Sequence, residues 1–163
     1  MKVISTACDP CLGGRDFDMC IFNHLVKEIE ERYKLKVRSN VKARVRLLKS
    51  CERLKKIMST NSTEIPLNVE CLMEDTDISC KMKREFFESL CEPLLARIRQ
   101  TMQKALSASN LKPDEIYSVE LVGGGTRIPA VKNLVKEIFG KEGSTTLNAD
   151  EAVARGCAFQ VWF

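Results

Sequence analysis

The segment at residues 118–131 constrains the fold of this chain most, because three consecutive glycines stand between a predicted strand and a predicted helix. Val119 and Leu121 belong to the apolar run of a buried strand, and Pro129 has the fixed φ that suits a first helical turn. The glycines at 123–125 lack a Cβ, so their backbone can adopt positive φ and a flat ligand can approach it directly. This order is typical of a ligand-binding loop, and it also occurs in an ordinary tight connection.

Two common phosphate-binding motifs do not fit the glycine segment. The spacing is not Gly-x-Gly-x-x-Gly, and no Gly-Lys-Ser/Thr follows. A second segment, residues 144–160, opens as a loop and continues as a predicted helix with small residues at Ala152, Ala154, Gly156 and Ala158. We expect this helix to pack closely against another element, which favours a functional turn over an ordinary connection.

Composition predicts a soluble globular protein of one or two compact units. Of 163 residues, 44% are hydrophobic and 29% are charged, and the formal net charge is only +4. There is no apolar stretch of membrane-spanning length, and the N-terminus lacks the apolar region of a signal peptide. We therefore expect a cytoplasmic protein, with the nucleus as a second compartment, and neither a membrane nor a nucleic-acid partner.

The cysteines do not form a complete metal-ligand set. Cys8 and Cys11 have the spacing of half a zinc site or a redox pair, but no second C-x-x-C exists and His24 is the only histidine. We expect reduced, structural cysteines and no metal site. Cys71 falls on the apolar phase of a predicted strand, where it would act as a small hydrophobe. The glycosylation sequence that begins at Asn61 is interpreted as a polar turn.

Hydrophobic periodicity and turn residues predict alternating elements along the chain. The expected elements are a strand at 1–7, helices at 16–33 and 40–59, strands after Pro66 and at 77–82, helices at 84–92 and 93–109, and the main strand before the glycine turn. In the helix at 40–59, Val41, Val45 and Leu48 are the expected apolar stripe, with Leu47, Leu54 and Ile57 as further candidates.

The helix at 40–59 is strongly basic. Its cations are Lys42, Arg44, Arg46, Lys49, Arg53, Lys55 and Lys56, and its only acidic residue is Glu52. A nucleic-acid interface would use such cations for phosphate contacts. The scarcity of aromatic residues and the spread of charge around the helix favour a solvent-exposed face instead. Glu52, Lys55, Lys56 and Ser59, at offsets of three, four and seven, lie on one side of the helix.

Four ordered motifs resemble one known family. They are Leu-Gly-Gly-Arg-Asp-Phe-Asp at 12–18, Cys-Glu-Arg-Leu-Lys-Lys at 51–56, Val-Gly-Gly-Gly-Thr-Arg-Ile-Pro-Ala-Val at 122–131 and Asn-Ala-Asp-Glu-Ala-Val-Ala-Arg-Gly at 148–156. Together they resemble the nucleotide-binding domain of the heat-shock 70 superfamily. The sequence of the last motif is more similar to the large, Hsp110-type branch of that superfamily. The resemblance covers nearly the whole chain.

The resemblance implies an α/β fold, namely one lobe of the actin-like (ribonuclease H-like) ATPase domain with an inserted α+β subdomain. The chain would correspond to the second lobe alone. Residues 1–12 and 92–163 would form its sheet-bearing, IIA-like subdomain. Residues 13–91 would form the smaller inserted, IIB-like subdomain.

The resemblance also implies an adenine-nucleotide site. On the basic helix, Glu52 and Lys55 would hold the ribose hydroxyls, Ser59 would approach an adenine ring nitrogen, and Lys56 would lay its methylene stem against one adenine face. Gly14 would lie near the phosphates. Lys56 replaces an arginine of the commoner family pattern, which weakens stacking but agrees with the Hsp110-like branch.

The remaining implied contacts come from the last third of the chain. The backbone of Gly123, Gly124 and Gly125 would approach the ribose and the α- and β-phosphates, and Arg127 would cover the second adenine face. Asp150 would reach the adenosine through water. Gly125 replaces a serine or alanine of the family pattern, which removes a possible hydroxyl contact.

The implied function is that of an ATP- or ADP-binding lobe in an Hsp110-type molecular chaperone and nucleotide-exchange factor for heat-shock 70 partners. Client polypeptides would bind to domains outside this chain. The family's two phosphate loops and the ligands of its Mg²⁺ are not found here, so we expect no ATP hydrolysis by this polypeptide alone. The alternative is a protein-interaction module with a vestigial nucleotide site, and a nucleic-acid-binding module is the third possibility.

Overall fold

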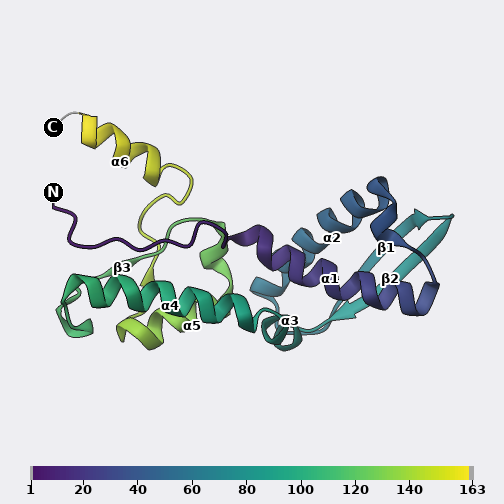
Figure 1. Cartoon of the computed structure of the whole chain (residues 1–163), viewed down its shortest axis with the longest axis horizontal. Helices are drawn as coiled ribbons and strands as arrows, with labels where there is room; N and C mark the ends of the chain where they lie inside the picture. The colour runs from purple at the N-terminus through teal and green to yellow at the C-terminus, as the bar shows by residue number, and fades with distance from the viewer. Residues whose placement is uncertain (1, 162–163) are drawn as a thin grey trace. The chain divides into compact units, whose positions relative to one another are not determined.

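The computed structural model describes residues 2–161, which divide into two compact units (Figure 1). Residues 11–94 form one unit, and residues 1–10 together with 95–163 form the other. The expected boundaries lie after residues 12 and 91. The assignment of the units to the IIA-like and IIB-like subdomains stays a prediction.

Helix α1 (Gly14–Tyr33) confirms the helix expected at 16–33. Its buried face contains Phe17, Ile21, Leu25 and Ile29 at steps of four residues, the spacing that keeps side chains on one side of a helix. The residue that follows the helix, Lys34, has φ of 59°, the left-handed conformation that is common at the C-terminal end of a helix.

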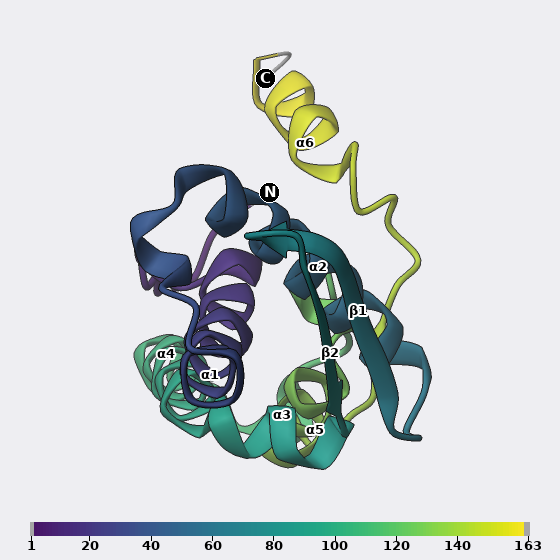
Figure 2. The same cartoon turned by 90° about the vertical axis from the view of Figure 1, so that its right-hand side faces the viewer.

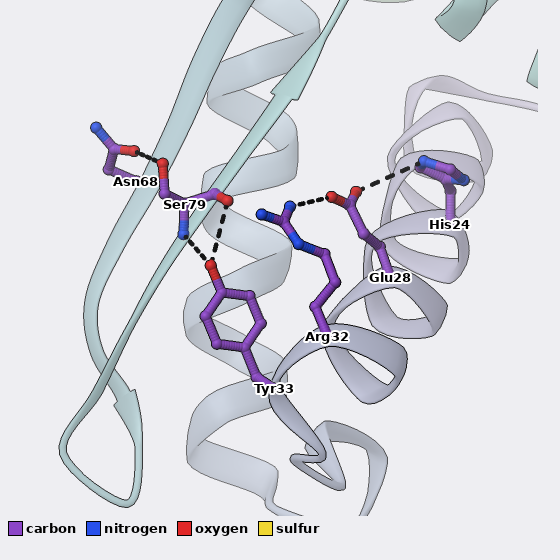
Figure 3. Close-up of polar contacts among 6 residues, drawn as sticks. All are labelled: His24, Glu28, Arg32, Tyr33, Asn68 and Ser79. Atoms are coloured by element: carbon purple, nitrogen blue, oxygen red, sulfur yellow. Dashed lines mark hydrogen bonds and ion pairs between the residues drawn. The ribbon is translucent and has the colours of Figure 1, made fainter.

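Polar contacts connect the end of α1 to the hairpin that follows later in the chain (Figure 3). The Tyr33 hydroxyl accepts a hydrogen bond from the Ser79 N–H at 3.3 Å and donates to the Ser79 carbonyl at 3.4 Å. Ser79 Oγ in turn donates to Asn68 Oδ1 at 2.9 Å. These contacts hold the end of α1 beside the hairpin.

Helix α2 (Val41–Thr60) forms where expected but buries a different face. Asn40 caps it by accepting a hydrogen bond from the Ala43 N–H at 3.1 Å. Its buried residues are Ala43, Leu47, Cys51, Leu54 and Met58. The expected stripe through Val41 and Val45 is wrong, because these side chains are 69% and 61% exposed. The five buried residues form an apolar stripe on the opposite side of the helix. This longer stripe packs against the rest of the unit because it buries more apolar surface.

Strands β1 (Ile65–Met73) and β2 (Thr76–Met82) form an antiparallel hairpin, and they run side by side in Figure 2. Leu67 pairs with Cys80 and Val69 with Ile78, and all four side chains are buried. An irregularity between Val69 and Met73 then shifts the alternation. Cys71, with φ of 43°, is exposed, so its expected apolar role is wrong: the bulge inverts the side-chain alternation at that point.

Two helices follow the hairpin, α3 (Arg84–Leu90) and α4 (Glu92–Ser109). Phe87 of α3 is buried, and its ring lies 6.2 Å from that of Phe17. Arg84 Nε donates to the Met58 carbonyl at 2.6 Å, which satisfies a backbone acceptor near the end of α2. Between α1 and α2 lies the short 3₁₀ helix η1 (Val37–Ser39).

The second unit has little sheet. After η2 (Pro113–Glu115) come β3 (Val119–Glu120), η3 (Gly124–Arg127), α5 (Pro129–Phe139), β4 (Gly143–Ser144) and α6 (Ala152–Val161). Strands β3 and β4 are parallel neighbours. The main strand expected before the glycine turn is therefore reduced to two residues.

The strand expected at 1–7 is not formed in its described part, residues 2–7. Ser5 Oγ donates to the Ala105 carbonyl at 2.8 Å, and Arg97 makes two hydrogen bonds to the Asp9 carboxylate. Side chains thus attach this segment to α4, but no strand pairs with it within residues 2–161. An extended segment without a backbone partner does not form a strand.

Helix α6 has no buried residue, and it stands apart from α4 and α5 in both views (Figures 1 and 2). Phe159 and Val153 are 67% and 71% exposed. The expected close packing of its small residues is therefore not found within the described part of the chain. Small residues permit a close approach but cannot cause one, because the approaching surface must come from elsewhere.

Candidate functional site

Helix α2 carries four of the residues predicted to contact a nucleotide, and two of them form an exposed ion pair. Lys56 Nζ lies 2.7 Å from Glu52 Oε1, one helical turn away. The Glu52 and Lys56 side chains are 50% and 70% exposed. The hydrogen bond from Lys56, followed by its charge, lowers the pKa of the Glu52 carboxyl. This pair is accessible to a ligand and is held only by a surface interaction.

Lys55 is held more firmly and connects α2 to the start of α1. Its Nζ donates to the Gly14 carbonyl at 2.8 Å and lies 2.8 Å from Asp18 Oδ1. Both charged side chains are only 13% exposed. Two of the three donor positions of this ammonium group are therefore occupied by partners within the protein.

Asp18 is a further candidate residue, which sequence reasoning did not single out. Burial raises the pKa of its carboxyl, although the hydrogen bond and the charge of Lys55 oppose this rise. Its Oδ1 is buried and lies 2.8 Å from Lys55 Nζ. The signal was available: Asp18 follows Gly14 by one helical turn within the motif at 12–18, which places both residues on the same side of α1.

Gly14 and Ser59 complete the predicted residues of this unit. A Cβ at Gly14 would lie 3.4 Å from Lys55 Nζ, an ordinary contact, so space alone does not require glycine there. Ser59 Oγ donates to the Lys55 carbonyl at 3.0 Å. To donate to a ring nitrogen of a ligand, this hydroxyl would have to turn away from that carbonyl.

In the other unit, the glycine turn is a tight backbone structure. Gly123 has φ of 93° and ψ of 152°, a conformation that residues with a Cβ rarely adopt. Its carbonyl accepts from the Thr126 hydroxyl at 2.7 Å and from the Thr126 N–H at 3.2 Å. A Cβ at Gly124 would have no atom within 4 Å, so this part of the turn is open.

The last two predicted residues are exposed. Arg127 ends η3, and its guanidinium has no ion pair or hydrogen bond with any residue in 2–161. Asp150 lies in a turn two residues before α6, where its N–H donates to Asn148 Oδ1 at 3.0 Å. Asp150 therefore lies just before the start of α6.

Each unit holds five of the ten predicted site residues. Residues 11–94 contain Gly14, Glu52, Lys55, Lys56 and Ser59, and the structure brings them together through the contacts of Lys55 and Lys56. The second unit contains Gly123, Gly124, Gly125, Arg127 and Asp150, of which the first four share one turn and Asp150 lies on a separate loop.

The cysteines have two kinds of environment. None is in a disulfide, and Cys51, Cys80 and Cys91 are buried as expected. Burial raises the pKa of the Cys51 thiol to about 12 and that of Cys80 to about 11, which keeps both protonated and unreactive. Cys8, Cys11, Cys71 and Cys157 are exposed, so they do not contribute to the buried core.

Neither a metal centre nor a membrane segment is evident in the described chain. Residues 2–161 contain no group of three or more His, Cys, Asp or Glu side chains placed to hold a metal ion. Over the same residues, no helix has both the length and the apolar character needed to cross a bilayer.

Comparison with known proteins identifies the class. The sequence profile of the family described as "Hsp70 protein" matches residues 1–162. The helix-rich units with small sheets are thus a fragment of an ATPase domain of the heat-shock chaperone class. The chain belongs to the Hsp70 family.

Individual relatives are about half identical to the chain. It is 52% identical over 160 residues to "Heat shock 70 kDa protein 4" of Rattus norvegicus, covering 98% of this chain and 19% of that protein. It is 50% identical to "Heat shock 70 kDa protein 4L" of Homo sapiens, with the same coverage. It is 48% identical to "97 kDa heat shock protein" of Mesocentrotus franciscanus, covering 98% of this chain and 18% of that protein.

These matches confirm the resemblance to the Hsp110-like branch of the superfamily. The chain spans about a fifth of the length of the curated relatives it matches, with 19% coverage of the first.

Proposed function

We propose that this chain is the nucleotide-contacting part of the second, actin-like lobe of an Hsp110-type chaperone, with residues 11–94 as an inserted subdomain. The observation that carries the proposal is the gathering of Gly14, Glu52, Lys55, Lys56 and Ser59 on one side of α2, where Glu52 and Lys56 are exposed. Membership of the Hsp70 family supports adenine nucleotide as the ligand.

The residues present fit an adenosine group. Glu52 has a carboxylate that can accept hydrogen bonds from ribose hydroxyls, and its pairing with Lys56 is exposed enough to rearrange at little cost. Arg127 has a planar guanidinium with no partner in residues 2–161, which suits stacking on a purine. The open backbone at Gly124 allows a ligand to approach the glycine turn closely.

The described residues do not by themselves fit a Mg²⁺ site, because no cluster of carboxylates is placed to hold one. We therefore assign no metal-dependent step to this chain. Bound ATP or ADP would supply the phosphate charge and the purine surface. The residues of the chain would orient the adenosine through Glu52 and Lys56 and cover the purine through Arg127.

One observation favours a second candidate function, a protein-interaction module with a vestigial nucleotide site. Lys55 is occupied by Gly14 and Asp18, and Ser59 donates to the backbone of its own helix. Both side chains would have to leave these partners in part to contact a ligand. A vestigial site would keep the same internal contacts and bind nothing.

For the whole protein, we propose nucleotide exchange on a heat-shock 70 partner in the cytoplasm and nucleus, with client polypeptides bound by domains outside this chain. The family relationship supports these proposals at the level of the family. Neither a membrane nor a nucleic-acid partner is part of the proposal.

Calorimetric titration of the chain with ADP and with adenosine tests the nucleotide site. We expect both to bind similarly and weakly, with Kd near the millimolar range, about 4 kcal/mol, because the contacts are to adenosine. Arg127→Ala should lose about 1–2 kcal/mol of this binding by removing a stacking face. Lys42→Ala, on α2 but without a role in the site, is the control and should bind as the original chain does.

Two results would contradict the proposal. If neither ligand binds, the vestigial module is correct. If adenosine binds but Arg127→Ala leaves its affinity unchanged, the ligand does not use the glycine turn as proposed.

A further inference from the structure

Residues 32–51 carry a concentration of positive charge that the nucleotide site does not use. This stretch has eight lysines and arginines and no acidic residue. Because the whole chain has a formal net charge of only +4, the remaining residues together carry −4. The whole stretch lies within the unit of residues 11–94.

Three of these cations already have partners. Arg32 pairs with Glu28 at 2.6 Å (Figure 3), and Arg38 donates to Asn23 Oδ1 at 3.0 Å. Arg46 donates to the carbonyls of Glu70 and Cys71 at 2.7 and 2.6 Å. In contrast, the ammonium groups of Lys34, Lys36, Lys42 and Lys49 have no ion pair or hydrogen bond with any described residue.

Two of these lysines, Lys34 and Lys36, line a pocket in the connection between α1 and α2. The pocket has a volume of about 500 Å³ and is lined by Glu30, Lys34, Leu35, Lys36, Arg38 and Ser39. Three of these residues are cationic and one is acidic. Leu35, which also lines the pocket, belongs to the buried core of the unit. This volume is within the usual range of ligand sites, about 300–1,000 Å³.

The N-terminal end of the α2 dipole is positive, like the side chains of the lysines and arginines near it. The helix is 20 residues long and starts at Val41, two residues after Ser39, with no acidic residue in its first turn. The positive end of its dipole is therefore uncompensated and adds to the charge of Lys36, Arg38 and Lys42. Together, the pocket and the helix start favour an anionic occupant.

Exposed aliphatic side chains on α2 help to distinguish which kind of anionic partner this surface would bind. Val41 and Val45 lie one turn apart on α2 and are 69% and 61% exposed. No aromatic side chain lines the pocket, whereas single-stranded nucleic acids bind by stacking bases on aromatic rings. A polypeptide with both carboxylates and aliphatic side chains matches this mixture better.

We propose that the α1–α2 basic surface, formed by Lys34, Lys36, Arg38, Val41, Lys42 and Val45, binds an acidic polypeptide segment. Carboxylates of that segment pair with the free lysines and Arg38. Its aliphatic side chains pack on Val41 and Val45. This interaction is separate from the proposed nucleotide contacts, which use Glu52, Lys55, Lys56 and Ser59 further along α2.

Fluorescence anisotropy with a short labelled peptide of alternating Glu and Leu tests the surface on the full chain. The variant Lys34→Gln/Lys36→Gln should weaken binding about tenfold, equivalent to about 1.4 kcal/mol. The control Lys104→Gln/Lys132→Gln removes the same charge from exposed positions outside the surface and should weaken binding less than about twofold. Binding should also weaken from low to physiological ionic strength.

Three results would overturn the proposal: equal binding of the peptide with Gln in place of Glu, no effect of Lys34→Gln/Lys36→Gln, or a single-stranded RNA that displaces the peptide at lower concentration. The last would establish a nucleic-acid site instead. If the double variant does not fold, amide chemical shifts of the original chain decide. Shifts around residues 34–45 on peptide addition support the surface, and shifts only elsewhere refute it.

Discussion

The two units of the chain differ in how completely they cover their apolar residues. Among the described residues, 22 buried hydrophobic residues lie in the unit of residues 11–94, and six lie in the other unit. The first unit packs α1, α2 and a long hairpin against one another. The second has two strands of two residues each and a helix, α6, with no buried residue.

Helices α2 and α6 show what this difference teaches. Both form where the sequence predicts a helix, yet α2 buries five residues and α6 buries none. Backbone hydrogen bonds of a helix are satisfied within a few residues, whereas burial requires a partner surface from elsewhere. We therefore expect most of the stability to reside in residues 11–94.

The largest effect on stability should come from a substitution in the core of residues 11–94. Leu47 is fully buried on α2, so Leu47→Ala leaves a cavity and should lower the free energy of unfolding by about 3 kcal/mol. Val153→Ala on α6, where the side chain is 71% exposed, should change it by less than about 0.5 kcal/mol. Urea unfolding followed by circular dichroism measures both. Equal effects would contradict the difference in burial between α2 and α6.

A smaller effect should come from the glycine turn of the second unit. Gly123→Ala forces a residue with a Cβ into φ of 93° and should cost about 1–3 kcal/mol. Gly124→Ala, where an added Cβ meets nothing within 4 Å, should cost less than about 0.5 kcal/mol. Hydrogen exchange of the Thr126 and Leu121 amides, which donate within this region, reports the loss locally. Unchanged protection in the Gly123 variant would show that the turn tolerates a side chain.

The smallest effect concerns the pH dependence of the buried Asp18. Its folded-state pKa is raised above the ordinary 3.8, mainly by burial, so the folded state binds its proton more tightly than the unfolded state does. Stability from this group is therefore present below pH 3.8 and is lost as pH rises through the raised pKa. Relative to Asp18→Asn, the original chain should become less stable over this interval.

Urea unfolding at a series of pH values checks the sign, with Glu52→Gln as the comparison. The pKa of Glu52 is lowered, mainly by its hydrogen bond from Lys56, so the original chain should gain stability relative to Glu52→Gln as pH rises. For each variant, the difference in the free energy of unfolding from the original chain is plotted against pH. Slopes of the same sign for both variants would contradict the different environments of these two carboxylates.

Local patterns predicted a large part of the fold, whereas the nucleotide-binding roles of the site residues came from the family resemblance and stay a prediction. The spacing of Phe17, Ile21, Leu25 and Ile29 predicted α1, and Pro129 marked the start of α5. The offsets of Glu52, Lys55, Lys56 and Ser59 placed them on one side of α2, where the structure has them. Such predictions succeed because the helical period is a property of the backbone itself.

The errors all involve contacts between distant segments. The stripe of Val41 and Val45 has helical spacing but faces away from the core, because a stronger stripe lies opposite. The alternation of apolar and polar residues in the sequence predicts that Cys71 is buried, but the bulge in its strand turns the side chain to the exposed face. The residues at 2–7 have a strand-like composition but no strand to pair with among those described.

Sequence alone therefore determined the helices, the hairpin and the glycine turn, because their hydrogen bonds and backbone angles are set by neighbouring residues. Tertiary structure decided which side of α2 is buried, where Cys71 points, and that Lys55 is shared between Gly14 and Asp18. It also left the lysines of the α1–α2 basic surface without partners in residues 2–161. Burial and ion pairing depend on which surface lies opposite a side chain, and that surface is brought there by distant parts of the chain.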